Sequence, residues 1–225
     1  FSIENNAQDN GSVNGALAAM AGNPALGGRG LIVVSPIIFN HPAFKAEDAR
    51  RSLMVNNGRS FYTVKYTDYT NRSDNAPILR YAEVLLNLAE AEARIGGVSA
   101  RAISLLNAVR GRAIATGTYA ATDFAAGKDL IGAILNERRI EFMAEGRRWA
   151  DIHRLALDTD FTTNGIPSKM AFGNATFATY NFVTNPTLVR NIPAVPYADY
   201  KFLWPIPADE LARNPTLAKQ QNPGY

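Results

Sequence analysis

Apolar and polar residues change their spacing along the chain, and the spacing predicts different elements before and after Pro77. Residues 1–3 have the composition of a strand end, and the alternation in FYTVKY, residues 61–66, predicts a second strand. Residues 5–14 are dominated by Asn, Gln, Asp, Ser and Gly, which is typical of a loop. We therefore expect short strands and loops in the first third of the chain.

After Pro77 the apolar residues recur at helical spacing, at Ala82, Leu85, Leu86, Ala89 and Ala93. Pro77 suits the first turn of this helix, and Gly96 and Gly97 suit its end. Ser99 can cap a second helix, whose buried stripe would be Ala102, Leu105, Leu106 and Val109. The two helices predict an antiparallel hairpin that resembles one tetratricopeptide unit.

Further helices are predicted at residues 128–145, where Gly146 ends the helix, and at residues 147–157. Residues 161–200 are rich in Thr, Asn and Pro, so we expect long ordered loops there. A helical turn should begin near Ala208, after Pro205 and Pro207. The expected fold is mainly α: tetratricopeptide-like helical hairpins with long ordered loops and a few short strands, in a single domain over residues 1–225.

Composition narrows the function classes. The 225 residues are 47% hydrophobic, enough to bury a substantial core. The net charge is only +3, and no run of Lys and Arg is interleaved with aromatic residues, so nucleic acid is not an expected partner. The absence of cysteine excludes disulfides and thiolate chemistry. The most apolar run, residues 31–39, is too short to span a bilayer.

Residues 136–154, NERRIEFMAEGRRWADIHR, concentrate acids and bases in one helical region. Glu137, Glu141 and Glu145 are four residues apart, so they share a helix face and repel one another unless they are paired. Apolar residues surround this stripe, which indicates a largely buried helix with paired charges. We predict a structural ion-pair lattice made of Glu137, Arg138, Glu141, Arg147, Asp151 and Arg154.

The same acids leave a second hypothesis open, a glycoside hydrolase that uses Glu137 or Glu141 with Asp151. Glycosidic hydrolysis needs two carboxyl groups that flank the bond, one of them with a raised pKa. Carboxyl groups on successive turns of one helix point the same way and cannot flank a substrate. This favours the structural ion-pair lattice over the glycoside hydrolase. The sequence also has no HExxH pair, calcium loop or GxSxG elbow. No catalytic residue, metal or cofactor is expected.

Four ordered segments resemble the C-terminal half of the SusD/RagB family: PILRYAEVLLNLAEAEAR (residues 77–94), LNAVRGRA (106–113), NERRIEFMAEGRRWADIHR (136–154) and FLWPIPADELARNPTLAKQQNPGY (202–225). GGRG at residues 27–30, the triplet Asp48, Ala49, Arg50 and the pair Lys65, Tyr66 are similar to the same family. The resemblance thus covers most of the chain.

This resemblance implies a non-enzymatic outer-membrane lipoprotein of the Bacteroidetes type, exposed at the cell surface. Such proteins bind oligosaccharides or other nutrients and deliver them to a SusC-like TonB-dependent transporter. The chain begins at Phe1, so we expect a piece of a longer protein that lacks the N-terminal part. Membrane contact would then come only through a lipid anchor in that missing part.

The resemblance also implies that ligand contacts come from the loop-rich region ahead of Asp48. Sugar sites combine an aromatic face with planar polar side chains. The ligand-binding candidates are Asn23, Arg29, Phe39, Asn40, His41 and Phe44, with Tyr66 and Tyr69 in reserve. Trp149 and Trp204 are expected in the core of the scaffold. Two alternatives stay open. In the first, the Asn and Gly residues of this region only make turns, and Phe39 and Phe44 only anchor the loop. In the second, the chain is a helical-repeat adaptor that binds protein and no sugar.

Overall fold

The computed structural model describes residues 1–170 and 192–225, and these residues divide into two compact units. The larger unit contains Phe1–Arg148, and the described residues of the smaller unit are 149–170 and 192–225. The single domain expected over residues 1–225 stays a prediction. Part of the region predicted as long ordered loops, residues 171–191, lies outside the described residues. None of the helices in the described ranges is long and apolar enough to cross a membrane.

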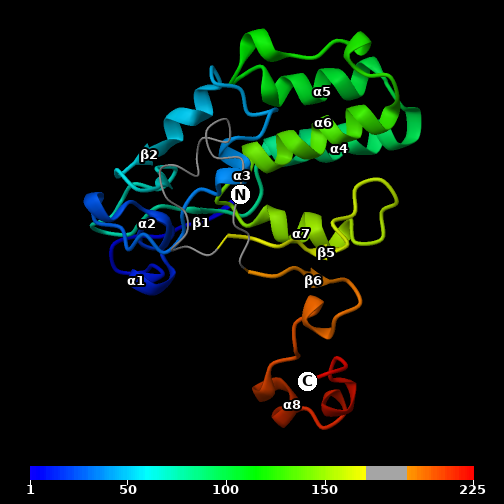
Figure 1. The fold of residues 1–225 in the computed structure, drawn as a ribbon. Coiled ribbons are helices and arrows are strands. Elements are labelled where there is room, and N and C mark those ends of the chain that lie inside the picture. The colour runs from blue at the N-terminus through cyan, green and yellow to red at the C-terminus, as the bar shows by residue number, and fades with distance from the viewer. Residues whose placement is uncertain (171–191) are drawn as a thin grey trace. The chain divides into compact units, whose positions relative to one another are not determined.

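The scaffold of the larger unit consists of three helices: α4 (Tyr81–Gly96), α5 (Ala100–Arg110) and α6 (Gly127–Glu141). Figure 1 shows them side by side, and α4 packs against both of the others. Leu86, Ala89, Leu106, Leu130 and Ile134 are fully buried between them. This confirms the helical hairpin and the mainly α fold predicted from the spacing of apolar residues.

The turn between α4 and α5 follows the predicted chemistry. Gly97 adopts φ +66°, a left-handed conformation that favours glycine, and it stops α4. The Ser99 side chain then accepts a hydrogen bond from the Ala102 amide at 3.1 Å and caps α5. The turn therefore fixes the register of the two helices.

The predicted role of Pro77 is wrong. Pro77 belongs to β4 (Ala76–Pro77), which pairs with β1 (Ser2–Ile3), and α4 begins only at Tyr81. The amides of Ile78 and Leu79 both donate to the Phe1 carbonyl, so the backbone is held extended by a segment that lies far away in sequence. The predicted strand end at residues 1–3 is confirmed by β1.

The third predicted helix ends earlier than expected. α6 stops at Glu141, and Ala144 and Gly146, with φ of +63° and +78°, separate it from α7 (Arg147–Arg154). A left-handed residue cannot continue an α-helix, so the break follows from Ala144 as well as Gly146. The Glu141 carbonyl accepts a hydrogen bond from Lys65 Nζ at 2.8 Å, which satisfies one of the carbonyls at the end of the helix.

Short elements complete the larger unit. They are α1 (Ser12–Gly15), α2 (Leu17–Ala21), α3 (Pro36–Phe39), β2 (Met54–Asn56) and β3 (Phe61–Thr63). β2 and β3 form an antiparallel hairpin in which Met54 pairs with Thr63, so the predicted strand is confirmed for its first three residues. α1 begins at Ser12, inside the loop predicted for residues 5–14, so the prediction is wrong for the last three residues of that loop.

The smaller unit has a small core of Ile152, Ala156 and Phe202. Its strands β5 (Gly165–Ile166) and β6 (Val195–Pro196) pair antiparallel, and α8 (Ala208–Arg213) confirms the helical turn predicted near Ala208. The expectation that Trp149 and Trp204 are core residues is wrong. They are 38% and 70% exposed, and their ring centroids lie 5.4 Å apart.

Candidate functional site

The acids of the 136–154 stretch take most of their partners from distant parts of the chain. A continuous set of salt bridges in the larger unit joins four acids to five bases: Asp48, Glu137, Glu141, Glu145, Arg50, Lys65, Arg80, Arg110 and Arg112. We call this set the buried ion-pair network. It is the main concentration of charge that the described residues bury.

Arg50 is the centre of the network. Its Nη1 lies 2.5 Å from Glu137 Oε1 and 3.0 Å from Glu141 Oε2. Its Nε and Nη2 donate to the two oxygens of Asp48 at 2.9 and 2.7 Å. Burial favours a neutral Asp48, but the hydrogen bonds from Arg50 outweigh it and lower the pKa of Asp48. All three acids around Arg50 are buried, so the guanidinium replaces their lost hydration.

Glu141 is bound from the other side as well. Its Oε1 accepts from Arg112 Nη2 at 2.6 Å and from Arg80 Nη1 at 3.0 Å. Burial by itself raises the pKa of Glu141, but the hydrogen bonds from Arg112 and Arg80 outweigh it and lower the pKa to about 2. A general acid needs the opposite shift, so Glu141 is unsuited to protonate a leaving group.

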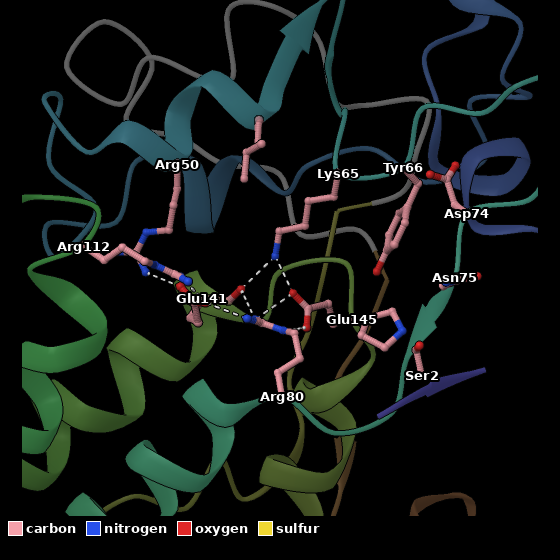
Figure 2. A pocket seen from close by; sticks show the side chains of 12 residues that line it. Ser2, Arg50, Lys65, Tyr66, Asp74, Asn75, Arg80, Arg112, Glu141 and Glu145 are labelled. Atoms are coloured by element: carbon pink, nitrogen blue, oxygen red, sulfur yellow. Dashed lines mark hydrogen bonds and ion pairs between the residues drawn. The ribbon is translucent and has the colours of Figure 1, made fainter. Parts of the chain in front are cut away.

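Glu137 and Glu145 complete the pattern. Glu137 Oε2 accepts from Arg110 Nη1 at 3.0 Å, and Glu145 binds Lys65 Nζ at 2.7 Å and Arg80 Nε at 2.8 Å. Figure 2 shows Arg80 reaching both Glu141 and Glu145, with Lys65 above Glu145. Every carboxyl of the network therefore has at least one basic partner.

Of the remaining members of the predicted lattice, Arg147 and Arg138 bind residues outside it, whereas Asp151 and Arg154 bind each other. Arg147 pairs with Glu83 of α4 at 3.2 Å. Arg138 donates to the side chain of Asn87. In the smaller unit Asp151 is 3% exposed and pairs with Arg154 at 2.8 Å, three residues along α7. The second acid of the hydrolase hypothesis is thus also held by a guanidinium.

A cavity of about 350 Å³ lies beside the network and is lined by Ser2, Lys65, Tyr66, Arg80 and Glu145, among others (Figure 2). Burial and the nearby Glu145 raise the pKa of Tyr66 to about 12, so its hydroxyl keeps its proton. Most charged groups on the wall are already engaged in the network. A ligand here would have to compete with existing ion pairs.

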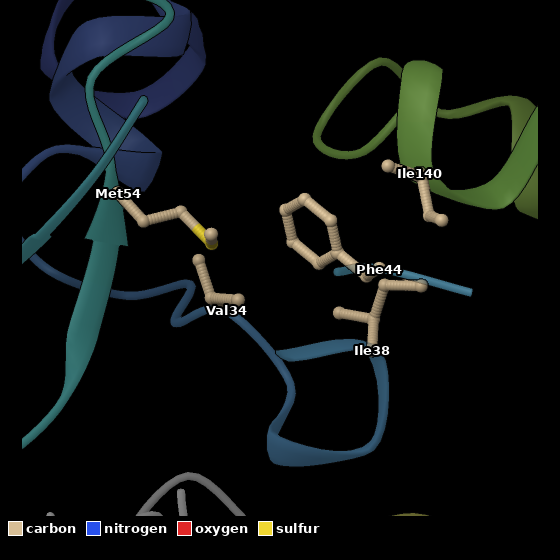
Figure 3. Close-up of a cluster of buried hydrophobic side chains, with 5 residues drawn as sticks. All are labelled: Val34, Ile38, Phe44, Met54 and Ile140. Atoms are coloured by element: carbon tan, nitrogen blue, oxygen red, sulfur yellow. The ribbon is translucent and has the colours of Figure 1, made fainter. Parts of the chain in front are cut away.

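Four of the six ligand candidates have structural roles. Asn23 is 2% exposed, and its side chain accepts a hydrogen bond from the Ala25 amide at 2.9 Å. The Asn40 side chain donates a hydrogen bond to the Pro36 carbonyl at 2.9 Å. Phe44 is 2% exposed in a core cluster with Val34, Ile38, Met54 and Ile140, as Figure 3 shows. Phe39 packs on Phe61 with ring centroids 4.4 Å apart.

The other two candidates stand apart from each other. Arg29 is exposed and donates to the Val13 carbonyl at 2.9 Å and to Asn14 Oδ1 at 2.7 Å. His41 is half-buried and lines a second cavity of about 500 Å³ together with Lys45, Tyr119 and Asn136. Sequence reasoning missed Tyr119 and Asn136, because they lie far from the loop region to which the resemblance assigned ligand contacts.

No group of three or more His, Asp or Glu residues in the described ranges could hold a metal ion. The structure therefore offers a helical scaffold, a buried ion-pair network and two cavities. These features place the protein in the class of helical scaffold proteins.

The sequence profile of the SusD family matches residues 40–225, and the chain belongs to this family. It is 32% identical over 196 residues to SusD-like protein P2 of Formosa agariphila, covering 85% of this chain and 32% of that relative. It is 31% identical over 233 residues to SusD-like protein P25 of the same organism, covering 96% of this chain and 40% of the relative. The chain thus spans well under half the length of these curated relatives.

Solved structures agree on the fold. A SusD superfamily protein from Bacteroides fragilis is 33% identical, with a TM-score of 0.56, and the match covers 79% of this chain and 36% of that one. Another SusD superfamily protein from the same species is 20% identical, with a TM-score of 0.62. This match covers 100% of this chain and 51% of that protein's chain. The latter likeness concerns the fold alone.

Proposed function

We propose that the protein binds oligosaccharides or polysaccharides as nutrients, without cleaving them, at the surface of a bacterial outer membrane. It would then pass them to a SusC-like TonB-dependent transporter. Membership of the SusD family supports this assignment. The lipid anchor that would hold the protein at the membrane belongs to this proposal.

The observation that carries the non-catalytic part is the state of the clustered carboxyls. Asp48, Glu137 and Glu141 are at most 3% exposed, and each accepts charged hydrogen bonds from arginine. A glycosidase needs one carboxyl with a raised pKa and another that is open to the substrate. The pKa of Glu141 moves the other way. The network is therefore suited to holding helices and loops together, and not to hydrolysis.

Glycan binding is tested by exposing the full-length protein to an array of neutral and acidic oligosaccharides. We expect a reproducible signal from one structural class of oligosaccharide. A helical-repeat adaptor would instead leave every sugar on the array unbound. That outcome would reject the proposed function.

Delivery to a transporter is tested separately, by tagging the full-length protein in its native host and solubilising the outer membrane. We expect a TonB-dependent transporter to co-purify at a stoichiometric level. Recovery of the tagged protein without any transporter would contradict this part of the proposal and leave glycan binding intact.

A further inference from the structure

The larger unit has a second cavity, of about 500 Å³. Its wall differs from that of the 350 Å³ cavity beside the buried ion-pair network, which we call the network cavity. Three segments form the second cavity: residues 41–45 after α3, residues 117–123 after α5, and α6 at Asn136. Its volume lies within the range of roughly 300–1,000 Å³ that is common for small-molecule sites.

Arg110 fixes these three segments relative to one another. Its side chain is fully buried, with Nε donating to the Gly117 carbonyl at 2.5 Å and Nη1 to the Ala43 carbonyl at 3.3 Å. The same Nη1 lies 3.0 Å from Glu137 on α6, which neutralises its charge. One residue of the ion-pair network therefore braces all three walls of this cavity, and such bracing reduces the ordering cost of binding.

Tyr119 is positioned in the same way. Its amide donates to Asn107 Oδ1 and its carbonyl accepts from Asn107 Nδ2, both at 2.8 Å, so that α5 holds the backbone at this point. Its ring packs on Phe124 with centroids 5.2 Å apart. The ring contributes an aromatic surface at a fixed place in the cavity wall.

The polar groups of this cavity retain hydrogen-bonding capacity. Within residues 1–170 and 192–225, the side chains of Lys45, Thr118 and Asn136 and the Tyr119 hydroxyl have no hydrogen-bond partner. His41 Nδ1 accepts from the Ala43 amide at 3.2 Å, so a neutral imidazole carries its proton on Nε2. Burial, aided by the charge of Arg139, lowers the pKa of His41 and favours this neutral form.

We propose that this cavity is a sugar subsite, which takes one neutral, hydroxyl-bearing ring of the glycan bound under the proposed function. The Tyr119 ring would contact the apolar side of the sugar, while His41 Nε2, Thr118 Oγ1 and the Asn136 amide pair with its hydroxyls. The amide can donate and accept at once, as a sugar hydroxyl requires. Lys45 and Asp123 carry opposite charges on the wall, so their charges offset each other and a neutral ligand is favoured over an anion.

The network cavity supplies a matched control. Ser2 lies on its wall and has no side-chain hydrogen bond among the described residues, so Ser2→Ala removes one free hydroxyl there. Thr118→Val removes one free hydroxyl from the proposed subsite and keeps the shape of the side chain. Asn136→Ala removes the amide, and alanine favours the helix at this position of α6, so the fold is retained.

The experiment measures binding by calorimetry in the full-length protein, with the oligosaccharide that gives the strongest signal on the array described above. Asn136→Ala should weaken binding about tenfold and Thr118→Val about fivefold, since each removes one hydrogen-bond partner. Ser2→Ala should leave the affinity unchanged, and all three variants should keep the melting temperature of the wild type. This result, with a neutral oligosaccharide as the binder, would support the subsite.

Three results would overturn the proposal. If the wild type binds and both subsite variants bind equally well, the cavity is not the subsite, whereas the proposed function stands. If the strongest binder is acidic and neutral sugars do not bind, the ligand class is wrong. If the wild type binds no sugar on the array, the proposed function fails and the subsite fails with it.

Discussion

Glu141 lies within 3.0 Å of three guanidinium groups, those of Arg50, Arg80 and Arg112. Removing one partner from a buried ion pair costs far more than removing a surface pair, because the charges left behind stay desolvated. In a glycosidase the same acid would stand apart from cations and face a substrate. If Glu141 has a structural role, its substitution should therefore lower the stability of the fold. A catalytic role does not require this loss of stability.

We predict that Glu141→Gln lowers the free energy of unfolding by about 3 kcal/mol, because its arginine partners lose a buried counter-charge. The matched control is Glu92→Gln. Glu92 pairs at 3.2 Å with Arg101, which is 67% exposed, so this change should cost less than about 1 kcal/mol. Urea denaturation followed by circular dichroism gives both values. Equal losses in the two variants would show that the buried network adds no special stability.

The pH dependence of stability has a definite sign. The folded pKa of Glu141, about 2, lies below its ordinary value of 4.5, so its stabilising effect is complete above pH 4.5 and is lost as pH falls toward 2. The difference in unfolding free energy between the wild type and Glu141→Gln should therefore shrink as the pH falls from 4.5 to 2. Denaturation at several pH values measures it. A constant difference across that window would contradict the assigned pKa.

Residue pairing was the least predictable feature from sequence. The period of four residues placed Glu137 and Glu141 on one face of α6, although Glu145 lies in the turn after it. Arg50 is 91 residues away from Glu141, and no local pattern joins them. A signal was nevertheless present in the motifs that resemble the SusD/RagB family. Four of those motifs contain a basic residue of the network. These residues are Arg50, Lys65, Arg80 and Arg110.

At the scale of elements, the spacing of apolar residues correctly predicted those helices and turns that are determined by residues close in sequence. The hairpin of α4 and α5 was predicted because its buried stripe, its glycine stop and its Ser99 cap all lie within a few residues of one another. The start of α4 was missed because pairing with β1 holds Pro77. The end of α6 was missed because Ala144, a good helix former, adopts φ +63°. Both errors come from contacts or conformations that local propensity does not encode.

The turn after α4 allows a clean test of backbone strain. A Cβ added at Gly96 or at Gly97 would meet no atom within 4 Å, so steric contacts cannot distinguish the two positions. Gly96 is the last residue of the helix, whereas Gly97 has φ +66° and ψ −135°. Gly96→Ala should stabilise the protein by a few tenths of a kcal/mol up to about 1 kcal/mol. Gly97→Ala should destabilise it by about 1–3 kcal/mol.

Thermal denaturation of the two glycine variants measures the difference. Opposite shifts of the melting temperature are expected, upward for Gly96→Ala and downward for Gly97→Ala. Shifts of the same sign and size would mean that the conformation of Gly97 does not determine where α4 ends.

At the scale of the whole molecule, the ion-pair network connects the loop region, the helical hairpin and α6. Asp48 and Arg50 come from the segment after the loops, Arg80 precedes α4, and Arg110 ends α5. The other three acids come from α6 and the turn after it. Arg110 extends this bracing to the proposed sugar subsite. The proposed subsite and the helical scaffold are therefore held by the same set of buried charges.

The family was predictable from the ordered motifs, whereas the cavity was not. His41 was the one ligand candidate that the structure places on the wall of the 500 Å³ cavity. Its neighbours there, Tyr119 and Asn136, are brought close by the packing of α5 and α6 and follow no local sequence pattern. Sequence reasoning could therefore assign the family, but it could not assemble a site from three separate segments.

The most direct test of the account asks whether the protein holds glycan without cleaving it. The full-length protein is incubated with its strongest-binding array oligosaccharide, and the release of new reducing ends is measured over time, alongside binding by calorimetry. We predict saturable binding with no reducing ends above the protein-free control, for the wild type and for Glu141→Gln alike. Reducing ends that form catalytically with the wild type, and fail to form with a folded Glu141→Gln variant, would contradict the account.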